Sequence, residues 1–366
     1  VSHPLDPLTP EEIDVAVAAV RATGRLPPTA TFSTITVDDA RRPAAGRRAR
    51  LMIVPGPEAS VVEASVALDS GEVVGWVTHE DVRPPLGFGE SLVAIAALHE
   101  HEGFRAALAA RGITDLAKVQ IDPWPTGNFG VAAEEGRRVA RCICFYREQP
   151  GDNGYARPIE GLQALVGMAR GEVLELFDTG IVPLPDDPGS YFPADHAPRP
   201  GLAPLVIAQP DGVGFEIDGN VLRWQGWSLH VSLDPLEGIV LRDVTYNGRS
   251  ILRRASISEM VVPYGDPGPL HGWKNAFDVG EWGLGRLANS LTLGCDCVGE
   301  IRYLDAVLAD EQGEAGTIAN AICLHEEDAG ILWKHNDLFT GRTEVRRKRR
   351  LVVSSIATVG DYEYGF

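Results

Sequence analysis

Apolar residues recur at helical spacing near the start of the chain and then at strand spacing. Thr9-Pro10-Glu11-Glu12 forms a capping box with Thr9 as the N-cap, so we expect a helix that ends near Ala22. The β-branched runs that follow predict four strands, at 31–37, 50–54, 60–68 and 73–78. One helix followed by a strand meander predicts a small α+β domain over residues 1–84.

Residues 85–193 repeat this order of elements without a visible similarity in sequence. The pattern predicts two helices and four strands, with the helices at 89–98 and 103–111 and the strands at 118–121, 138–146, 162–168 and 173–178. Proline- and glycine-rich segments at 183–189 and 198–201 mark a linker. We therefore expect a second small α+β domain.

Residues 194–366 contain only short strand-like runs separated by turn residues. Predicted strands lie at 213–217, 221–224, 228–233, 238–246, 251–257, 290–293, 300–306, 318–324 and 350–358. Strands at this spacing favour a β-sandwich. The last run is followed by no obvious closing turn, which would leave an unpaired sheet edge. We expect an α+β protein: two small α+β domains followed by the incomplete N-terminal part of a large antiparallel β-sandwich.

The chain carries a large excess of acidic residues, 51 Asp and Glu against 33 Lys and Arg, for a net charge of −18. Such a surface repels phosphate backbones, which argues against nucleic acid as a partner. It would attract a cationic substrate such as a protonated amine, or serve only to keep the protein soluble. The chain has no apolar run of about 18 residues and no signal-peptide pattern at its start, so we expect no membrane contact and a cytoplasmic location.

The chain ends with a distinctive motif. Residues 359–366 read Val-Gly-Asp-Tyr-Glu-Tyr-Gly-Phe and resemble the cofactor segment of copper amine oxidases, whose core reads Asn-Tyr-Asp/Glu-Tyr. Four further segments resemble motifs of this family and occur in its order: Val-Pro-Tyr-Gly-Asp-Pro at 262–267, Phe-Asp-x-Gly-Glu at 277–281, Asn-Ser-Leu-x-Leu-Gly-Cys-Asp-Cys at 289–297, and Ile-Cys-x-His-Glu-Glu-Asp at 322–328. The whole is most similar to bacterial phenylethylamine oxidases.

The resemblance implies roles for individual residues. Tyr362 would be oxidised in place to topaquinone, and Asp278 would be the general base that removes a proton from the carbon next to the amine nitrogen. Tyr264 would hydrogen-bond the quinone, and Asp361 would lie beside it, where the family has asparagine. Without the resemblance, Tyr362 and Tyr364 would be strand aromatics on one face of a sheet, and Asp278 would be a turn residue.

The resemblance also implies a metal and a partner. The family's copper ligands are a His-x-His pair and a third histidine, and all follow the quinone tyrosine, so copper would be bound by residues outside this chain. We expect a second polypeptide to supply them, in a dimer of heterodimers that converts a primary amine, oxygen and water to an aldehyde, ammonia and hydrogen peroxide. The chain alone would be inactive. The alternatives are a non-catalytic scaffold or binding subunit with this fold, and a truncated fragment of a conventional oxidase.

Several smaller expectations follow from the same comparison. Cys297 and Cys323 correspond to the family's disulfide pair. Ala276 stands two residues before Asp278, where relatives carry a larger side chain, which predicts a wider substrate channel. The basic run at 342–350 is interpreted as a charged segment that leads into the cofactor strand. The other interpretation, a nucleic-acid-binding patch, is disfavoured because the chain as a whole is strongly acidic.

Overall fold

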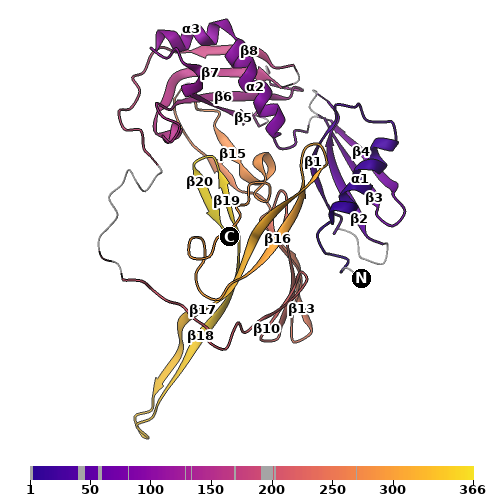
Figure 1. The fold of residues 1–366 in the computed structure, drawn as a ribbon, viewed down its shortest axis with the longest axis vertical. Coiled ribbons are helices and arrows are strands. Elements are labelled where there is room, and N and C mark those ends of the chain that lie inside the picture. The colour runs from indigo at the N-terminus through magenta and orange to yellow at the C-terminus, as the bar shows by residue number, and fades with distance from the viewer. Residues whose placement is uncertain are drawn as a thin grey trace.

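The computed structural model describes residues 3–366 apart from 40–45, 57–59, 81, 128, 133, 169, 191–200, 202 and 269. Figure 1 shows two helix-covered sheets in the first half of the chain and a larger β region that carries a long hairpin. Helices are few and the sheets are antiparallel, so the α+β fold class expected from the sequence is confirmed. None of the helices in the described residues is long and apolar enough to cross a membrane.

The first unit is one helix packed on a four-stranded sheet. Helix α1 (Pro10–Ala22) begins at the expected capping box, in which Thr9 Oγ1 accepts from the Glu12 N–H at 3.2 Å and the Glu12 carboxylate accepts from the Thr9 N–H at 3.0 Å. Ile13 and Val20 of the helix are buried against the sheet. The strand order is β1 (Thr31–Val37), β2 (Arg48–Val54), β3 (Ser60–Ala67) and β4 (Glu72–Glu80).

The second unit has two helices, α2 (Phe88–Glu100) and α3 (Glu102–Ala110), on another four-stranded sheet. Its strand order is β5 (Val119–Pro125), β6 (Val139–Tyr146), β7 (Pro158–Gly167) and β8 (Glu172–Asp178). Strand β5 lies at the edge of this sheet and contains Pro123 and Pro125. Proline is tolerated at an edge because it cannot donate to the hydrogen-bond ladder. This edge strand contributes to the site described below.

The β region packs two antiparallel sheets face to face as a sandwich. The first has the order β13 (Arg249–Ala255), β12 (Gly238–Tyr246), β11 (Trp227–Asp234), β10 (Val221–Trp224) and β9 (Glu216–Asp218); the second has the order β16 (Arg302–Ala309), β17 (Ala315–Asn336) and β18 (Thr343–Ser354). Leu222 and Val231 of the first sheet share a buried core with Ile322 and Leu324 of the second. This shared core holds the two sheets of the sandwich together, and two short hairpins lie outside these sheets.

These two hairpins carry the candidate site. Strand β14 (Val261–Pro263) pairs with β15 (Asn275–Phe277), and β19 (Ile356–Val359) pairs with β20 (Tyr362–Gly365). The strand predicted at 350–358 is therefore broken at Ser355, between β18 and β19. The expectation that no turn follows it is wrong, because β20 folds back on β19.

The segment 290–293 is also not a strand, contrary to the sequence prediction. The Asp296 carboxylate accepts from the Thr292 N–H at 2.7 Å, and Gly294 adopts a φ of +86°, so the chain makes a compact turn here. Side chains that bond to nearby backbone groups compete with a strand ladder, which explains the failed prediction.

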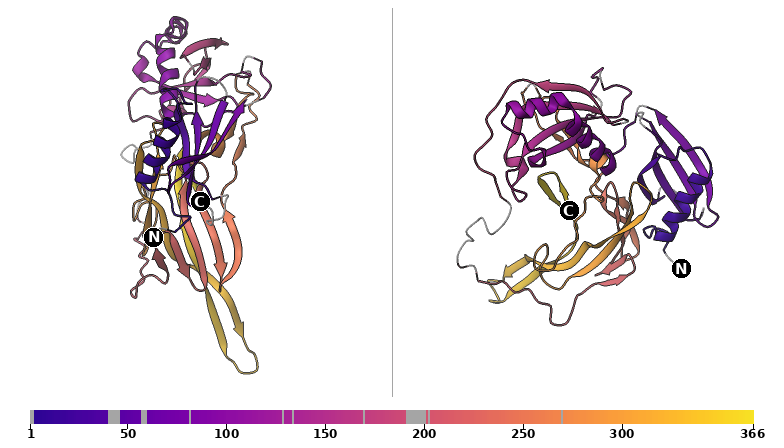
Figure 2. Two further views of the ribbon diagram at one scale, coloured as in Figure 1. Left: turned by 90° about the vertical axis from the view of Figure 1, so that its right-hand side faces the viewer. Right: turned by 45° about the horizontal axis from the view of Figure 1, so that its top comes forward.

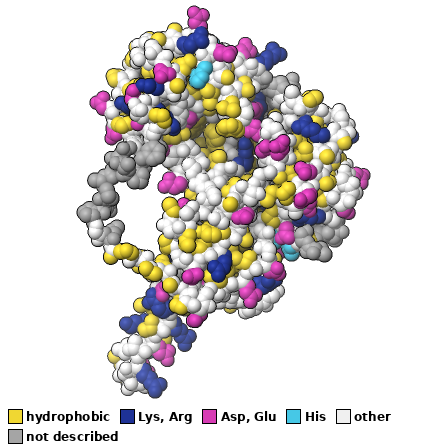
Figure 3. All heavy atoms as spheres, in the orientation of Figure 1, with side chains coloured by type: hydrophobic (Ala, Val, Ile, Leu, Met, Phe, Trp, Pro, Cys, Tyr) yellow, Lys and Arg dark blue, Asp and Glu magenta, His cyan; other side chains and the backbone are white. Residues whose placement is uncertain are grey.

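Strands β17 and β18 continue beyond the sandwich as a two-stranded arm, which Figure 1 and the left view of Figure 2 show projecting past the other elements. The basic run at 342–350 forms most of β18, and its positively charged side chains stand out along the arm in Figure 3. Arg347 pairs with Asp328 at 2.6 Å and Arg350 pairs with Glu327 at 3.0 Å across the arm. An exposed, charged strand has no hydrophobic alternation, so sequence patterning placed the start of this strand too late.

Candidate active site

A tight hairpin presents Tyr362 to the centre of the site. Val359 of β19 lies opposite Tyr362 of β20, which leaves only Gly360 and Asp361 in the loop. Gly360 adopts a φ of +60°, which glycine tolerates without strain. The rings of Tyr362 and Tyr364 stack with their centroids 6.5 Å apart. The same-face arrangement expected from their spacing is confirmed.

Tyr264 contacts the hydroxyl of Tyr362. It directly follows β14, and the two phenolic oxygens lie 3.2 Å apart although the residues are 98 positions apart in the chain. Burial first, and then this hydrogen bond, raise the pKa of Tyr264. The phenol therefore keeps its proton and remains able to donate a hydrogen bond.

Asp278 begins a short π-helical turn (Asp278–Trp282) that follows β15. Its side chain is buried, and its backbone N–H donates to the Met260 carbonyl at 2.9 Å. The Tyr364 hydroxyl donates to Asp278 Oδ2 at 2.6 Å. Burial, followed by this hydrogen bond, raises the pKa of Tyr364, so this phenol also stays protonated and orients the carboxylate.

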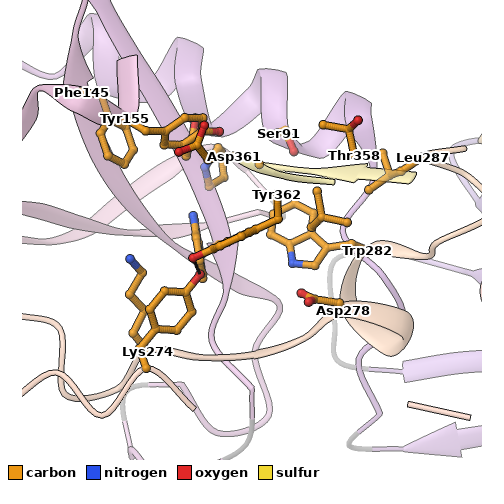
Figure 4. A pocket seen from close by; sticks show the side chains of 16 residues that line it. Ser91, Phe145, Tyr155, Lys274, Asp278, Trp282, Leu287, Thr358, Asp361 and Tyr362 are labelled. Carbon is orange, nitrogen blue, oxygen red and sulfur yellow. Dashed lines mark hydrogen bonds between the residues drawn. The ribbon is translucent and has the colours of Figure 1, made fainter. Parts of the chain in front are cut away.

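Asp278 and Tyr362 line one cavity of about 410 Å³. Figure 4 shows the Tyr362 ring reaching into it, with Asp278 on one side and Asp361 near Tyr155 on the other. The space-filling view in Figure 3 shows a hollow lined by hydrophobic side chains between the α2–α3 unit and the β region. Mostly apolar walls with a few convergent polar groups are typical of a site for a small molecule.

Sequence reasoning missed several side chains that line this cavity, among them Trp124, Lys274 and Trp282. The Trp124 ring packs edge-on against those of Tyr264 at 5.7 Å, Trp273 at 6.3 Å and Trp282 at 6.2 Å. The Lys274 ammonium lies 4.4 Å from the ring centroid of Tyr264 and 4.7 Å from that of Trp124, a cation–π arrangement. Lys274 and Trp282 lie close to the Phe-Asp-x-Gly-Glu motif at 277–281, so the sequence offered a reason to consider them. Nothing in the strand pattern singled out Trp124.

The two substitutions expected to alter the site occupy different places. Asp361 lines the cavity from the turn of the hairpin. Ala276 is buried in β15 opposite Val262 and is not part of the cavity wall. The wall contains Trp124 and Trp282, and the wider channel expected at Ala276 stays a prediction.

The expected disulfide is not formed in the structure. Cys297 and Cys323 are free thiols, although they belong to the same small buried cluster. The Tyr303 hydroxyl lies 3.4 Å from Cys297 Sγ, and His325 Nδ1 lies 3.4 Å from Cys323 Sγ. Burial, and then a hydrogen bond with the Cys297 thiol, raise the pKa of Cys323 to about 12.

Within the described residues, the cavity carries no set of imidazoles of the kind that copper prefers. In that part of the chain, the one group of three side chains able to hold a metal ion is His3, Asp6 and His230, and none of them lines the cavity. His230 Nε2 and Asp6 Oδ1 lie 3.0 Å apart, a contact that fastens the N-terminal segment to β11. Copper therefore does not fit the described residues that line the cavity.

Glu281, three residues after Asp278, gives a prediction of pH dependence. Burial raises its pKa from 4.5 to about 7. The Glu281 carboxyl therefore binds its proton more tightly in the folded chain than in the unfolded chain. Its contribution to the free energy of unfolding is fully present below pH 4.5, the ordinary pKa, and is lost as the pH rises through about 7. We expect Glu281→Gln to raise the free energy of unfolding at about pH 8 by on the order of 2–3 kcal/mol relative to its effect at about pH 5.

Urea unfolding at both pH values measures this difference. Glu172→Gln, an exposed change on β8, is the control and should leave the pH dependence unaltered. If the Glu281→Gln variant and the unaltered chain lost the same free energy of unfolding between the two pH values, the raised pKa of Glu281 would be contradicted.

Two family descriptions match the chain, "Copper amine oxidase, N3 domain" over residues 90–194 and "Copper amine oxidase, enzyme domain" over residues 216–366. Together they cover both the sheet that supplies β5 and the region that supplies Asp278 and Tyr362. Relatives that align with the whole chain include proteins named as a primary amine oxidase and a copper methylamine oxidase. The chain belongs to the copper amine oxidase family.

The chain is similar to several full-length relatives. It is 43% identical over 378 residues to "Primary amine oxidase" of Arthrobacter sp. (strain P1), covering 100% of this chain and 58% of the relative. It is 42% identical to "Histamine oxidase" of Arthrobacter globiformis and 39% identical to "Diamine oxidase [copper-containing] 1, peroxisomal" of Nicotiana tabacum, covering 55% and 54% of those proteins. The solved copper-containing benzylamine oxidase from Hansenula polymorpha superposes with a TM-score of 0.87 at 28% identity, covering 100% of this chain and 61% of that one.

The chain thus spans little more than half the length of the curated relatives it matches. Their names give different amines, so the relatives do not fix a substrate for this chain. One of them is described as peroxisomal, so the cytoplasmic location stays a prediction.

Proposed function

We propose that this chain is the quinone-bearing part of a copper-dependent primary-amine oxidase, with Tyr362 as the precursor of topaquinone. The observation that carries this proposal is the shared cavity, where the Tyr362 hydroxyl meets Tyr264 and the Tyr362 ring lies near the buried Asp278 carboxylate. The overall reaction converts a primary amine, oxygen and water to an aldehyde, ammonia and hydrogen peroxide. The quinone would supply a two-electron acceptor for the amine, and copper bound outside this chain would serve to form that quinone.

The residues of this chain would bind the amine, orient it and move one proton. Asp278 is placed to accept the proton from the carbon next to nitrogen, and the Tyr364 hydroxyl holds that carboxylate in position. Tyr264 would orient the ring at position 362 through its protonated hydroxyl. Trp124, Trp282 and Tyr264 line the cavity, and an amine that displaces water from between these rings would meet stronger electrostatic interactions there.

The copper ligands would come from outside these 366 residues. The described part of the cavity provides no such ligand set, and the chain covers 58% of the primary amine oxidase it matches. A second polypeptide would supply the histidines in a dimer of heterodimers. A longer form of the same chain is the alternative source.

A non-catalytic scaffold or binding subunit is the second candidate. It is favoured by Asp361, a carboxylate at the cavity where the family motif has asparagine. A negative charge there would disfavour a negatively charged quinone next to it.

Intact mass spectrometry and metal analysis of protein purified from its native source through this chain would separate these possibilities. A copper-bearing second polypeptide, with Tyr362 heavier by two oxygens less two hydrogens, would support the split oxidase. A single longer polypeptide with both features would support a conventional oxidase of which this is a part. Copper-free protein with unmodified Tyr362 would contradict both and favour the scaffold.

A further inference from the structure

Lys274 brings a primary amine into the cavity that holds Tyr362. It directly precedes β15 and lines the cavity together with Tyr362 and Asp278. Its Nζ lies 4.4 Å from the ring centroid of Tyr264 and 4.7 Å from that of Trp124. Figure 4 shows Lys274 and Asp278 on different sides of the Tyr362 ring. A nitrogen that can act as a nucleophile therefore borders the proposed site of amine oxidation.

The Lys274 amine has no directly paired anion among the described residues. Its side chain makes no hydrogen bond or ion pair there, and the carboxylates of Asp266, Glu160 and Asp122 act on it only by longer-range attraction. Burial is the largest influence on the pKa of Lys274 and lowers it. A larger share of this side chain is therefore neutral, and only the neutral amine has the free electron pair that attacks a carbonyl carbon.

The other three lysines of the chain have different surroundings, and all four lie in its described part. Lys118 pairs with Glu148, and this contact raises the pKa of Lys118. Lys334 and Lys348 are exposed on the arm. None of these three lysines lines the cavity. Lys274 therefore differs from them in its position, in its lack of a paired carboxylate or its burial, and in its access to a ligand of the cavity.

The cavity has room for a small aldehyde next to this amine. Its volume is about 410 Å³, and Trp124, Trp282 and Leu287 give it apolar walls. Walls of this kind hold the hydrocarbon part of a small molecule, while a few polar groups fix its orientation. An aldehyde bound between these walls would lie within the space that the Lys274 amine borders.

We propose that Lys274 is a carbonyl-binding site, at which aldehydes that enter the cavity form a reversible imine. The amine nitrogen bonds to the carbonyl carbon, the carbon–oxygen bond breaks, and the oxygen leaves as water with the two protons that the nitrogen gives up. Addition of water reverses the step, and no oxidant or reductant takes part. The aldehyde product of amine oxidation would thereby occupy the cavity and inhibit further turnover. This inference rests on the proposed function, because it assigns a regulation to the same cavity.

Chemical trapping in the Tyr362→Phe form of the complete protein tests the site without amine oxidation. This form cannot make the quinone, so no carbonyl cofactor competes for the reagent. Butanal with cyanoborohydride should leave a butyl group on Lys274, with about tenfold more label than on any other lysine of the chain, because the cavity holds the aldehyde beside the amine. Peptide mass spectrometry measures the label. Lys274→Arg keeps the charge and the ring contacts, and it should remove this label alone. Equal labelling of the four lysines, or weaker labelling of Lys274, would overturn the site.

Inhibition of the complete, copper-loaded oxidase tests the effect on turnover. Added butanal should inhibit the oxidation of 1-aminobutane by the unaltered enzyme, and Lys274→Arg should raise the apparent inhibition constant by about tenfold or more. Lys334→Arg, an exposed change on the arm, is the control and should alter that constant by no more than about twofold.

The two tests together separate this inference from the proposed function. An unaltered enzyme that butanal does not inhibit, or an unchanged inhibition constant in the Lys274→Arg enzyme, would overturn the regulation by product. Trapping at Lys274 in a protein whose unaltered form oxidises no amine would instead overturn the proposed function and leave the carbonyl-binding site standing.

Discussion

Replacing Asp278 by asparagine in the complete, copper-loaded oxidase should lower kcat for amine oxidation by about 10²–10⁴-fold, the usual range for loss of a general base. The amide is nearly the same size and still accepts a hydrogen bond from Tyr364, so the geometry of the site should persist. It cannot accept the proton from the carbon next to nitrogen. Oxygen consumption with a saturating primary amine measures the effect.

Glu363→Gln is the matched control for this prediction. Glu363 is the neighbour of Tyr362 on β20, and its exposed side chain does not line the cavity. It should retain nearly full activity. If Asp278→Asn oxidised amines at a rate close to that of the control, Asp278 could not be the base, and the proton would have to go to another group.

Replacing Tyr362 by phenylalanine should abolish both quinone formation and amine oxidation. Phenylalanine lacks the hydroxyl that Tyr264 contacts and the phenol chemistry from which the quinone forms. The complete, copper-loaded variant should show no visible quinone absorption, no coloured adduct with phenylhydrazine, and no added oxygen at position 362 by mass spectrometry. Its far-ultraviolet circular dichroism should match that of the unaltered protein, because the side chain is half exposed.

Tyr364→Phe is the corresponding control, because it removes the hydroxyl of a tyrosine two residues away. It should still form the quinone, but it loses the hydrogen bond to Asp278 and should lower kcat by about threefold to tenfold. Quinone absorption in the Tyr362→Phe variant would show that another tyrosine is the precursor. The roles assigned to Tyr362 and Tyr264 would then be withdrawn.

Local patterns predicted most of the secondary structure where one face of an element is buried. The capping box at Thr9 and the strand at 31–37 match α1 and β1 because their hydrophobic periodicity comes from packing on a single core. Prediction failed for the arm, where β18 is exposed and charged, and at 290–293, where Asp296 turns the chain through a side-chain hydrogen bond. In both places no buried face imposes a pattern that a reader of the sequence can detect.

Some residues of the candidate site could likewise be predicted from the sequence, and others were found only in the tertiary structure. The family motifs in the sequence determined that Tyr264, Asp278 and Tyr362 belong to one site, because each motif is a long local run of residues. Only the tertiary structure shows that Tyr364 orients Asp278 and that the β5 edge brings Asp122 and Trp124 into the cavity. These contacts join units that fold around separate cores, and which of their side chains meet depends on how those cores pack together rather than on any local pattern.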